Sequence, residues 1–172
     1  PIPPYDAAGW TLAYLMDVKF DRIMDDFTGP FERSAYGKLL KPENKLPEAS
    51  EYVLSSMQND SYVAVNDLLK NNEQVYRSTE NGDFYVAGST KSKAILQKAN
   101  VKLNPSTAPK NKIKIAPAKI ALWDVYGGSM PSGWVRWIME QYHYDATVVY
   151  AKDIDAGNLK SKYDVIVFVG GA

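Results

Sequence analysis

Residues 119–125 read KIALWDV, residues 126–129 read YGGS, and residues 165–172 read VIVFVGGA. The first and last runs are continuously apolar, which is typical of strands that are covered on both faces of a parallel sheet. Between them, one face of a predicted helix carries apolar side chains at Val135, Ile138, Met139 and Tyr142. A strand, a glycine-rich turn, a helix and a second strand predict a βα unit of a parallel sheet.

The same pattern continues through this part of the chain. A strand is predicted at 147–150, a turn of helix at 156–160 and a strand at 163–169. Residues 119–172 therefore predict an α/β fold with a parallel sheet and a flavodoxin-like, three-layer βαβαβ architecture. Because the last apolar strand needs a covering helix and none follows it, we expect this architecture to be incomplete at its C-terminus and the chain to be a piece of a longer protein.

Three further parts precede this one. Residues 1–50 predict a short helix, a strand at 18–23 and a long connection interrupted by prolines. Residues 51–104 predict a small α/β unit, and residues 105–118, with their prolines and lysines, predict a linker. An alternative is that all four parts form one domain.

The α/β unit at 51–104 has strong local signals. A strand at 52–54 precedes a first helix, whose end is predicted by the dipeptide NN at 71–72. The dipeptide NG at 81–82 lies between two apolar runs and predicts a β-hairpin. Ser89 or Thr90 is expected to cap a second helix.

Composition excludes several classes of function. Lys and Arg together number 20, as do Asp and Glu, so no net field favours nucleic acid or an anionic membrane as a partner. No apolar run approaches the roughly 20 residues that span a bilayer. The chain has no cysteine, which excludes disulfides, a thiolate nucleophile and cysteine-ligated zinc.

The sequence offers no convincing catalytic or metal-binding group. His143 is the only histidine, so a zinc site with two histidines cannot form within this chain. We expect His143 to lie past the end of its helix, too far from Ser129 and Ser132 to act as their base. Asp153, Asp155 and Asn158 have a spacing that could suit a hard cation, although a solvated loop is the favoured interpretation. We therefore expect no catalytic residue, no metal ligand and no cofactor in this chain.

The best candidate for a binding site lies at the carboxyl ends of the predicted parallel strands. Gly127, Gly128 and Ser129 form a turn between a strand and a helix, where free N–H groups can bind an anion. Gly170 and Gly171 follow a neighbouring strand and should reach the same edge, where parallel sheets bind ligands. These residues predict a crevice for a small molecule or a peptide. The alternative is that the glycines serve only the tight turn.

Two surface features have competing interpretations. Trp134 and Trp137 are expected in the core, with a platform for carbohydrate or peptide as the alternative. The final strand, if its edge is exposed, predicts self-association, because unpaired N–H and C=O groups accept another strand.

Three passages carry a family resemblance: residues 5–12 (YDAAGWTL), 66–86 with its NDLL, VYR and FYV runs, and 133–166, which begins GWVRWIMEQY. Together they resemble the region downstream of the catalytic domain in large bacterial zinc carboxypeptidase-like proteins. In those proteins this region leads into a class I glutamine amidotransferase-like domain of flavodoxin-like topology.

The resemblance implies a non-catalytic accessory region of a putative metallopeptidase hydrolase, which supports or gates an upstream peptidase domain in proteolysis. Zinc would be bound by that upstream domain, and the protein would be secreted to the periplasm or the exterior. The zinc ligands and catalytic residues of the family cannot be placed on this chain. Where the family typically has Met-Asp-Glu-Gly-Trp, this chain has MPSGW at 130–134, so a carboxylate role at that turn is in doubt.

Overall fold

The computed structural model describes residues 13, 16, 18–33, 35, 45–99, 101–106 and 110–170. The chain divides into two units, Pro1–Lys41 and Pro42–Ala172. Within the first unit, the strand expected at 18–23 is absent, and Val18, Phe20 and Ile23 are exposed. Alternation alone does not make a strand where no second strand or apolar layer receives its side chains. The helix expected before it falls largely outside the described residues.

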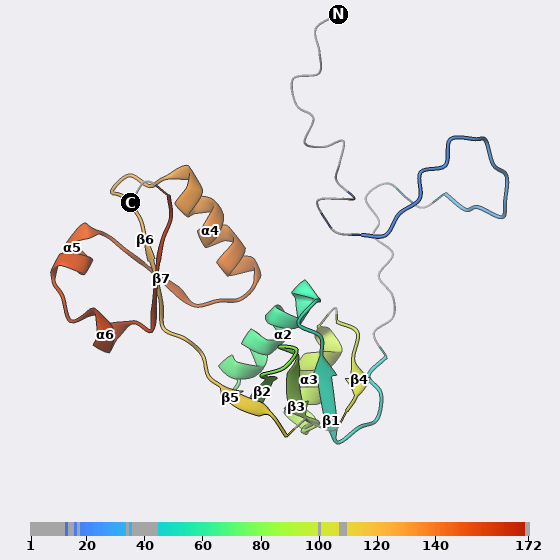
Figure 1. Ribbon diagram of the computed structural model, residues 1–172, viewed down its shortest axis with the longest axis horizontal. Helices are drawn as coiled ribbons and strands as arrows, with labels where there is room; N and C mark the ends of the chain where they lie inside the picture. The colour runs from blue at the N-terminus through green and yellow to red at the C-terminus, as the bar shows by residue number, and fades with distance from the viewer. Residues whose placement is uncertain are drawn as a thin grey trace, which may run out of the picture. The chain divides into compact units, whose positions relative to one another are not determined.

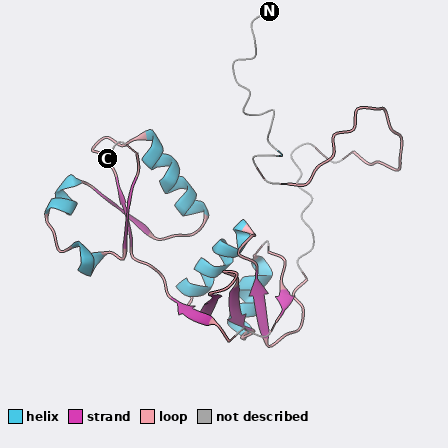
Figure 2. Cartoon of the chain, viewed as in Figure 1, coloured by secondary structure: helices cyan, strands magenta, loops and turns pink. Residues whose placement is uncertain are grey.

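The second unit begins with an antiparallel sheet covered by two helices (Figures 1 and 2). The strands are β1 (Glu51–Leu54), β2 (Val75–Ser78), β3 (Phe84–Ala87), β4 (Asn104–Pro105) and β5 (Lys112–Ile115). The helices are α2 (Asn59–Lys70) and α3 (Thr90–Lys98). The strand order is β4-β1-β3-β2-β5, and every neighbouring pair is antiparallel. The succession β1-α2-β2-β3-α3-β4 in this order is the split βαβ arrangement of ferredoxin-like domains.

One face of this sheet forms the main core of the protein. Tyr52 and Leu54 of β1 pair in register with Val86 and Phe84 of β3, so the four side chains share a face. They cluster with buried residues of both helices, including Ala64, Val65, Leu68 and Leu96. The expected ends of the helices are confirmed, since Asn72 has a φ of 62° and the Ser89 side chain accepts from the N–H of Ser92.

The hairpin predicted around residues 81–82 is confirmed: β2 and β3 are antiparallel neighbours. The loop that joins them is longer than a two-residue turn. Ser78 donates its N–H to Asp83 at 2.9 Å, and Gly82 donates its N–H to Ser78 at 3.2 Å. Gly82 has a φ of 78°, and Asn81 is not in the left-handed region. Gly82 therefore closes a four-residue loop as its single left-handed residue.

The segment interpreted as a linker, 105–118, contains strand structure. β5 pairs with β2 from Val75–Ile115 to Ser78–Lys112, and Pro105 of β4 pairs with Tyr52. The alternation of lysine and isoleucine over 112–115 was a valid strand signal. The surrounding prolines favoured a linker instead, but Pro105 lies in the edge strand β4, where proline is tolerated.

A second, parallel sheet follows, with helices on both sides. It contains β6 (Ile120–Trp123), β7 (Ala146–Val149) and β8 (Val165–Phe168) in the order β7-β6-β8. Its helices are α4 (Met130–Gln141), α5 (Ala151–Asp155) and α6 (Leu159–Lys162). The predicted mixture of strands and helices around a parallel sheet is confirmed. The helix expected at 156–160 is replaced by two short helices separated by Gly157, whose φ is 69°.

The strand order explains why the helices lie on both sides. The first crossover runs from β6 to β7, and the second returns past β6 to β8. Because crossovers are right-handed, reversing direction moves the connecting helices to the opposite face. Figure 1 shows α4 on one side of the strands and α5 and α6 on the other.

This second sheet buries little of its apolar surface. Its buried apolar residues, among those described, are Ala121, Leu122 and Val149. Trp134 and Trp137, expected in the core, are 61% and 52% exposed, which corrects that prediction. Val135 and Met139 are the less exposed apolar residues of α4 and line a hollow with Ile120 of β6, whereas the two tryptophans lie on another side of the helix. Among the described residues, no helix has the length and apolar character to cross a membrane.

Candidate functional site

The structure brings the predicted crevice residues to one edge of the parallel sheet. Gly127, Gly128 and Ser129 form the loop between β6 and α4, and Gly170 follows β8. β8 pairs directly with β6, with Phe168 opposite Trp123, so both loops leave the sheet at its carboxyl edge. Gly171 lies outside the described residues.

The loop after β6 uses its own N–H groups. The Asp124 Oδ1 accepts from the N–H of Val125 at 2.8 Å and from that of Ser129 at 3.1 Å. Gly128 donates its N–H to the carbonyl of Val125 at 2.9 Å. The Asp124 carboxylate therefore occupies the position of an anion at the start of α4, and its charge disfavours a second anion there.

The two glycines are explained by backbone conformation. Gly127 and Gly128 have φ values of 93° and 81°, in the region that favours glycine. A Cβ at Gly127 would meet no atom within 4 Å, so the backbone conformation, and not crowding by the protein's own atoms, favours glycine here. Ser129 caps α4 by accepting from the N–H of Ser132 at 3.3 Å. This turn favours an uncharged ligand, and ligand binding at the crevice remains a prediction.

The outer side of α4 carries an aromatic stripe, defined here as Met130, Trp134, Trp137 and Ile138. These side chains are 79%, 61%, 52% and 48% exposed. Their spacing of i, i+4, i+7 and i+8 places them on one side of the helix. The two indole rings make an edge-to-face contact, with 6.0 Å between centroids. An apolar surface with this much aromatic area is typical of a contact with another protein or domain.

A polar contact joins α2 to the loop between α4 and β7. His143 Nδ1 lies 2.6 Å from Asp67 Oδ1, and Lys70 Nζ lies 2.8 Å from Asp145 Oδ1. Asn66 Nδ2 donates to the carbonyl of Tyr142 at 2.7 Å. Sequence analysis placed His143 past the end of its helix but missed this contact, because its partners are about 75 residues earlier in the chain.

His143 also ends α4 in an unusual conformation for its residue type. Its φ is 58°, and Tyr144 donates its N–H to Met139 at 2.8 Å while His143 donates its N–H to Glu140 at 3.1 Å. This is the Schellman arrangement, in which glycine is the usual left-handed residue. A histidine at this position accepts a conformational cost and contributes the contact to Asp67.

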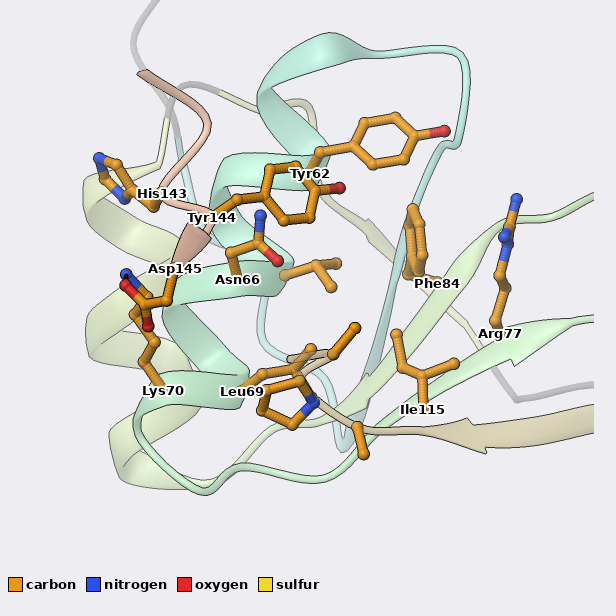
Figure 3. Close-up of a pocket in the computed structure, with 14 residues that line it drawn as sticks. Tyr62, Asn66, Leu69, Lys70, Arg77, Phe84, Ile115, His143, Tyr144 and Asp145 are labelled. Atoms are coloured by element: carbon orange, nitrogen blue, oxygen red, sulfur yellow. Dashed lines mark hydrogen bonds and ion pairs between the residues drawn. The ribbon is translucent and has the colours of Figure 1, made fainter. Parts of the chain in front are cut away.

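A cavity of about 210 Å³ lies beside this contact (Figure 3). It is bounded by α2, by strands of the antiparallel sheet, by residues 115–118 and by residues 143–145. Residues 116–118 precede β6 and residues 143–145 precede β7, so the cavity lies at the amino ends of the parallel strands. Sequence analysis looked for ligands at the carboxyl ends and had no signal for this site, whose walls come from distant segments.

Asp153, one of the acidic residues considered for a cation, has a structural role in helix α5. Asp153 Oδ2 accepts from the N–H of Tyr150 at 2.9 Å and so caps α5. Within the described parts of the chain, no group of three or more histidine, aspartate or glutamate side chains could hold a metal ion. Asp153 and Asp155 lie in helix α5 and not in a solvated loop, which corrects that expectation.

Comparison of the chain with protein-family models, with curated proteins and with solved structures finds no match.

Proposed function

We propose that this chain is a non-catalytic accessory region of a zinc carboxypeptidase-like protein, which supports or gates an upstream peptidase domain. The proposal rests on the resemblance of residues 5–12, 66–86 and 133–166 and on one structural observation. That observation is the exposed aromatic stripe of α4, which supplies a surface for packing against another domain. Zinc belongs to the peptidase domain in this proposal, and the protein acts in the periplasm or outside the cell.

The finer architecture belongs to the same proposal. The order β7-β6-β8 equals the first three strands of a flavodoxin-like sheet, in which the first strand lies between the second and the third. We take these strands to be part of a three-layer amidotransferase-like domain. Residues 1–172 contain no cysteine that could serve as the amidotransferase nucleophile.

The first experiment compares this chain with its full reading frame. We expect bound zinc and release of C-terminal residues from peptides in the longer protein, and neither in residues 1–172 alone. Zinc content by atomic absorption and peptide products by mass spectrometry would measure both. Hydrolysis by the isolated chain, or neither property in either protein, would contradict the proposal.

A second experiment tests the aromatic stripe within the longer protein. The double variant Trp134→Ser, Trp137→Ser removes two large apolar contacts, each able to contribute about 2 kcal/mol when buried. We expect a lower melting temperature of the peptidase domain and slower hydrolysis. Arg136→Ser changes an exposed residue between the two tryptophans and should alter neither property. Equal behaviour of the double variant and the wild-type protein would exclude the stripe as a domain contact.

The second candidate function is a binding module for a small molecule or peptide at the carboxyl edge of the parallel sheet. The observation in its favour is that the loop with Gly127, Gly128 and Ser129 and the turn with Gly170 follow two paired strands at the same edge, with a fully exposed Tyr126 in the first loop. A neutral peptide that raises the melting temperature in a saturable manner would support it. The variant Tyr126→Ser should then weaken that effect.

A further inference from the structure

The cavity at the amino ends of the parallel strands has an apolar wall built from the core of the antiparallel sheet. Its apolar lining includes Val65, Leu69, Phe84, Ile115 and Pro117. Val65 and Phe84 are each only 4% exposed, so this wall is held by the packing of the main core. A wall of this kind is preformed, which is characteristic of small-molecule sites.

Two polar atoms at the cavity, the Asn66 Oδ1 and the Tyr144 hydroxyl oxygen, make no hydrogen bond among the described residues. The amide of Asn66 is oriented by its Nδ2 bond to the carbonyl of Tyr142, because that carbonyl requires a donor. The Asn66 oxygen is thereby turned toward the side of Phe84, and the Tyr144 ring lies next to it (Figure 3). The Tyr144 hydroxyl makes no hydrogen bond within the described structure, whereas that of Tyr62 donates to Ser56 at 3.1 Å.

The charged groups around the cavity are already engaged. Lys70 pairs with Asp145, and His143 pairs with Asp67. Arg77 Nε donates to the carbonyl of Gly82 at 3.2 Å, and its guanidinium lies 5.6 Å from the centre of the Phe84 ring. Figure 3 shows this guanidinium beyond the Phe84 ring as seen from Asn66. The cavity therefore presents apolar carbon, the Asn66 oxygen and the Tyr144 hydroxyl, together with the Tyr62 hydroxyl, which already donates to Ser56.

We propose that this cavity is a binding site for a small neutral molecule with an aromatic body and one hydroxyl or carboxamide group. The body packs against Leu69, Phe84 and Ile115, and the polar group donates to Asn66 Oδ1 and accepts from the Tyr144 hydroxyl. A hydroxyl or a carboxamide offers both functions in one group, which neither a hydrocarbon nor a carboxylate does. The site is separate from the predicted crevice and does not depend on the proposed accessory function.

Phenol is the probe for this site, with toluene and benzoate as comparison ligands. Titration of the ¹⁵N-labelled chain with phenol should shift the amide signals of residues around the cavity in a saturable manner. For a ligand of this size we expect a dissociation constant on the order of 1 mM. Toluene should bind more weakly, because it leaves Asn66 and Tyr144 unpaired. Benzoate should bind more weakly, because its charge loses water while Lys70 is paired with Asp145 and the Arg77 guanidinium lies beyond the Phe84 ring.

Variants separate the cavity from the rest of the surface. Tyr144→Phe removes only the hydroxyl and should weaken phenol binding about fivefold. Tyr163→Phe removes a hydroxyl outside the cavity and should leave the affinity unchanged. Ala116→Leu places a larger side chain at an exposed position of the lining and should abolish saturable binding.

Three results would overturn the proposal. The first is the absence of saturable shifts at the cavity with phenol. The second is equal binding of toluene and phenol, which would remove the role of Asn66 and Tyr144. The third is tighter binding of benzoate that is lost in Arg77→Gln, which would make the site one for anions.

Discussion

At the scale of the residue, the Glu73 carboxylate is held by two serine hydroxyls at the start of α3. Ser89 Oγ and Ser92 Oγ donate to Glu73 Oε2 at 2.8 and 2.6 Å. These bonds, that of Ser92 first, lower the pKa of Glu73 from its ordinary value of 4.5. The ionised form is the one that folding stabilises. The ionised Glu73 therefore adds to the free energy of unfolding above pH 4.5, and this stabilisation is lost as the pH falls through the lowered pKa.

Ser92→Ala tests this arrangement. Ser92 is fully buried, and loss of its bond to a carboxylate should lower the free energy of unfolding by about 1–2 kcal/mol at neutral pH. The pKa of Glu73 should rise toward its ordinary value, and the urea-unfolding curves of variant and wild type should converge as Glu73 becomes protonated in acid. A constant difference at every pH would assign the loss to packing.

Ser61 provides the matched control. It is also fully buried, but its Oγ has no hydrogen-bond partner within the described residues. Ser61→Ala removes a buried, unpaired polar atom from the first turn of α2 and introduces the best helix former. The free energy of unfolding should stay the same or rise by about 1 kcal/mol.

At the scale of the element, the end of α4 combines a strained residue with a contact to α2. A left-handed conformation costs a residue other than glycine about 1 kcal/mol, and the half-exposed pair of His143 with Asp67 contributes a similar amount. His143→Gly should therefore leave the free energy of unfolding nearly unchanged. The strain and the contact disappear together.

The variant Asp67→Ala shows whether this pairing is real. It should lower the free energy of unfolding by about 0.5–1 kcal/mol in the wild-type background and by almost nothing in the His143→Gly background. Urea denaturation of the four proteins measures the coupling. The same loss in both backgrounds would mean that Asp67 acts without His143.

At the scale of the whole molecule, β8 lies at the edge of the parallel sheet and has exposed apolar side chains. Val165 and Phe168 are 46% and 55% exposed, and among the described residues β8 pairs with β6 alone. We predict concentration-dependent self-association through this edge, measurable by sedimentation equilibrium. Val165→Lys should suppress it, whereas Thr147→Lys, on the opposite edge strand β7, should not. A wild-type chain that stays monomeric at high concentration would contradict the prediction.

Local signals in the sequence predicted local structure well. Asn72, Gly82 and Ser89 act at the positions expected of them, because capping and turn chemistry depend on a few neighbouring residues. Burial was less predictable. Trp134 and Trp137 have the periodicity of a core helix, but their exposure depends on which side of α4 packs against β6, and that side carries Val135 and Met139.

Of the two candidate sites, one could be predicted from the sequence and the other could not. Gly127, Gly128, Ser129 and Gly170 could be brought together from the rule that parallel strands end at one edge, and the structure places them there. The cavity beside His143 could not be predicted, because Asn66 and Tyr144 become neighbours only through the packing of α2 against the loop before β7. Asp124 was also missed, since its role depends on the path of the loop.

The two sheets take their strands from separate, continuous stretches of the chain, 51–115 and 120–168. During synthesis, every strand of the antiparallel sheet is therefore made before the first parallel strand begins. At about 5–20 residues per second, the ribosome needs roughly 3–10 s to add the remaining residues of the second sheet. The first sheet can complete its core on the ribosome in that interval, and α2 is then ready as a surface onto which the nascent loop at 142–145 docks.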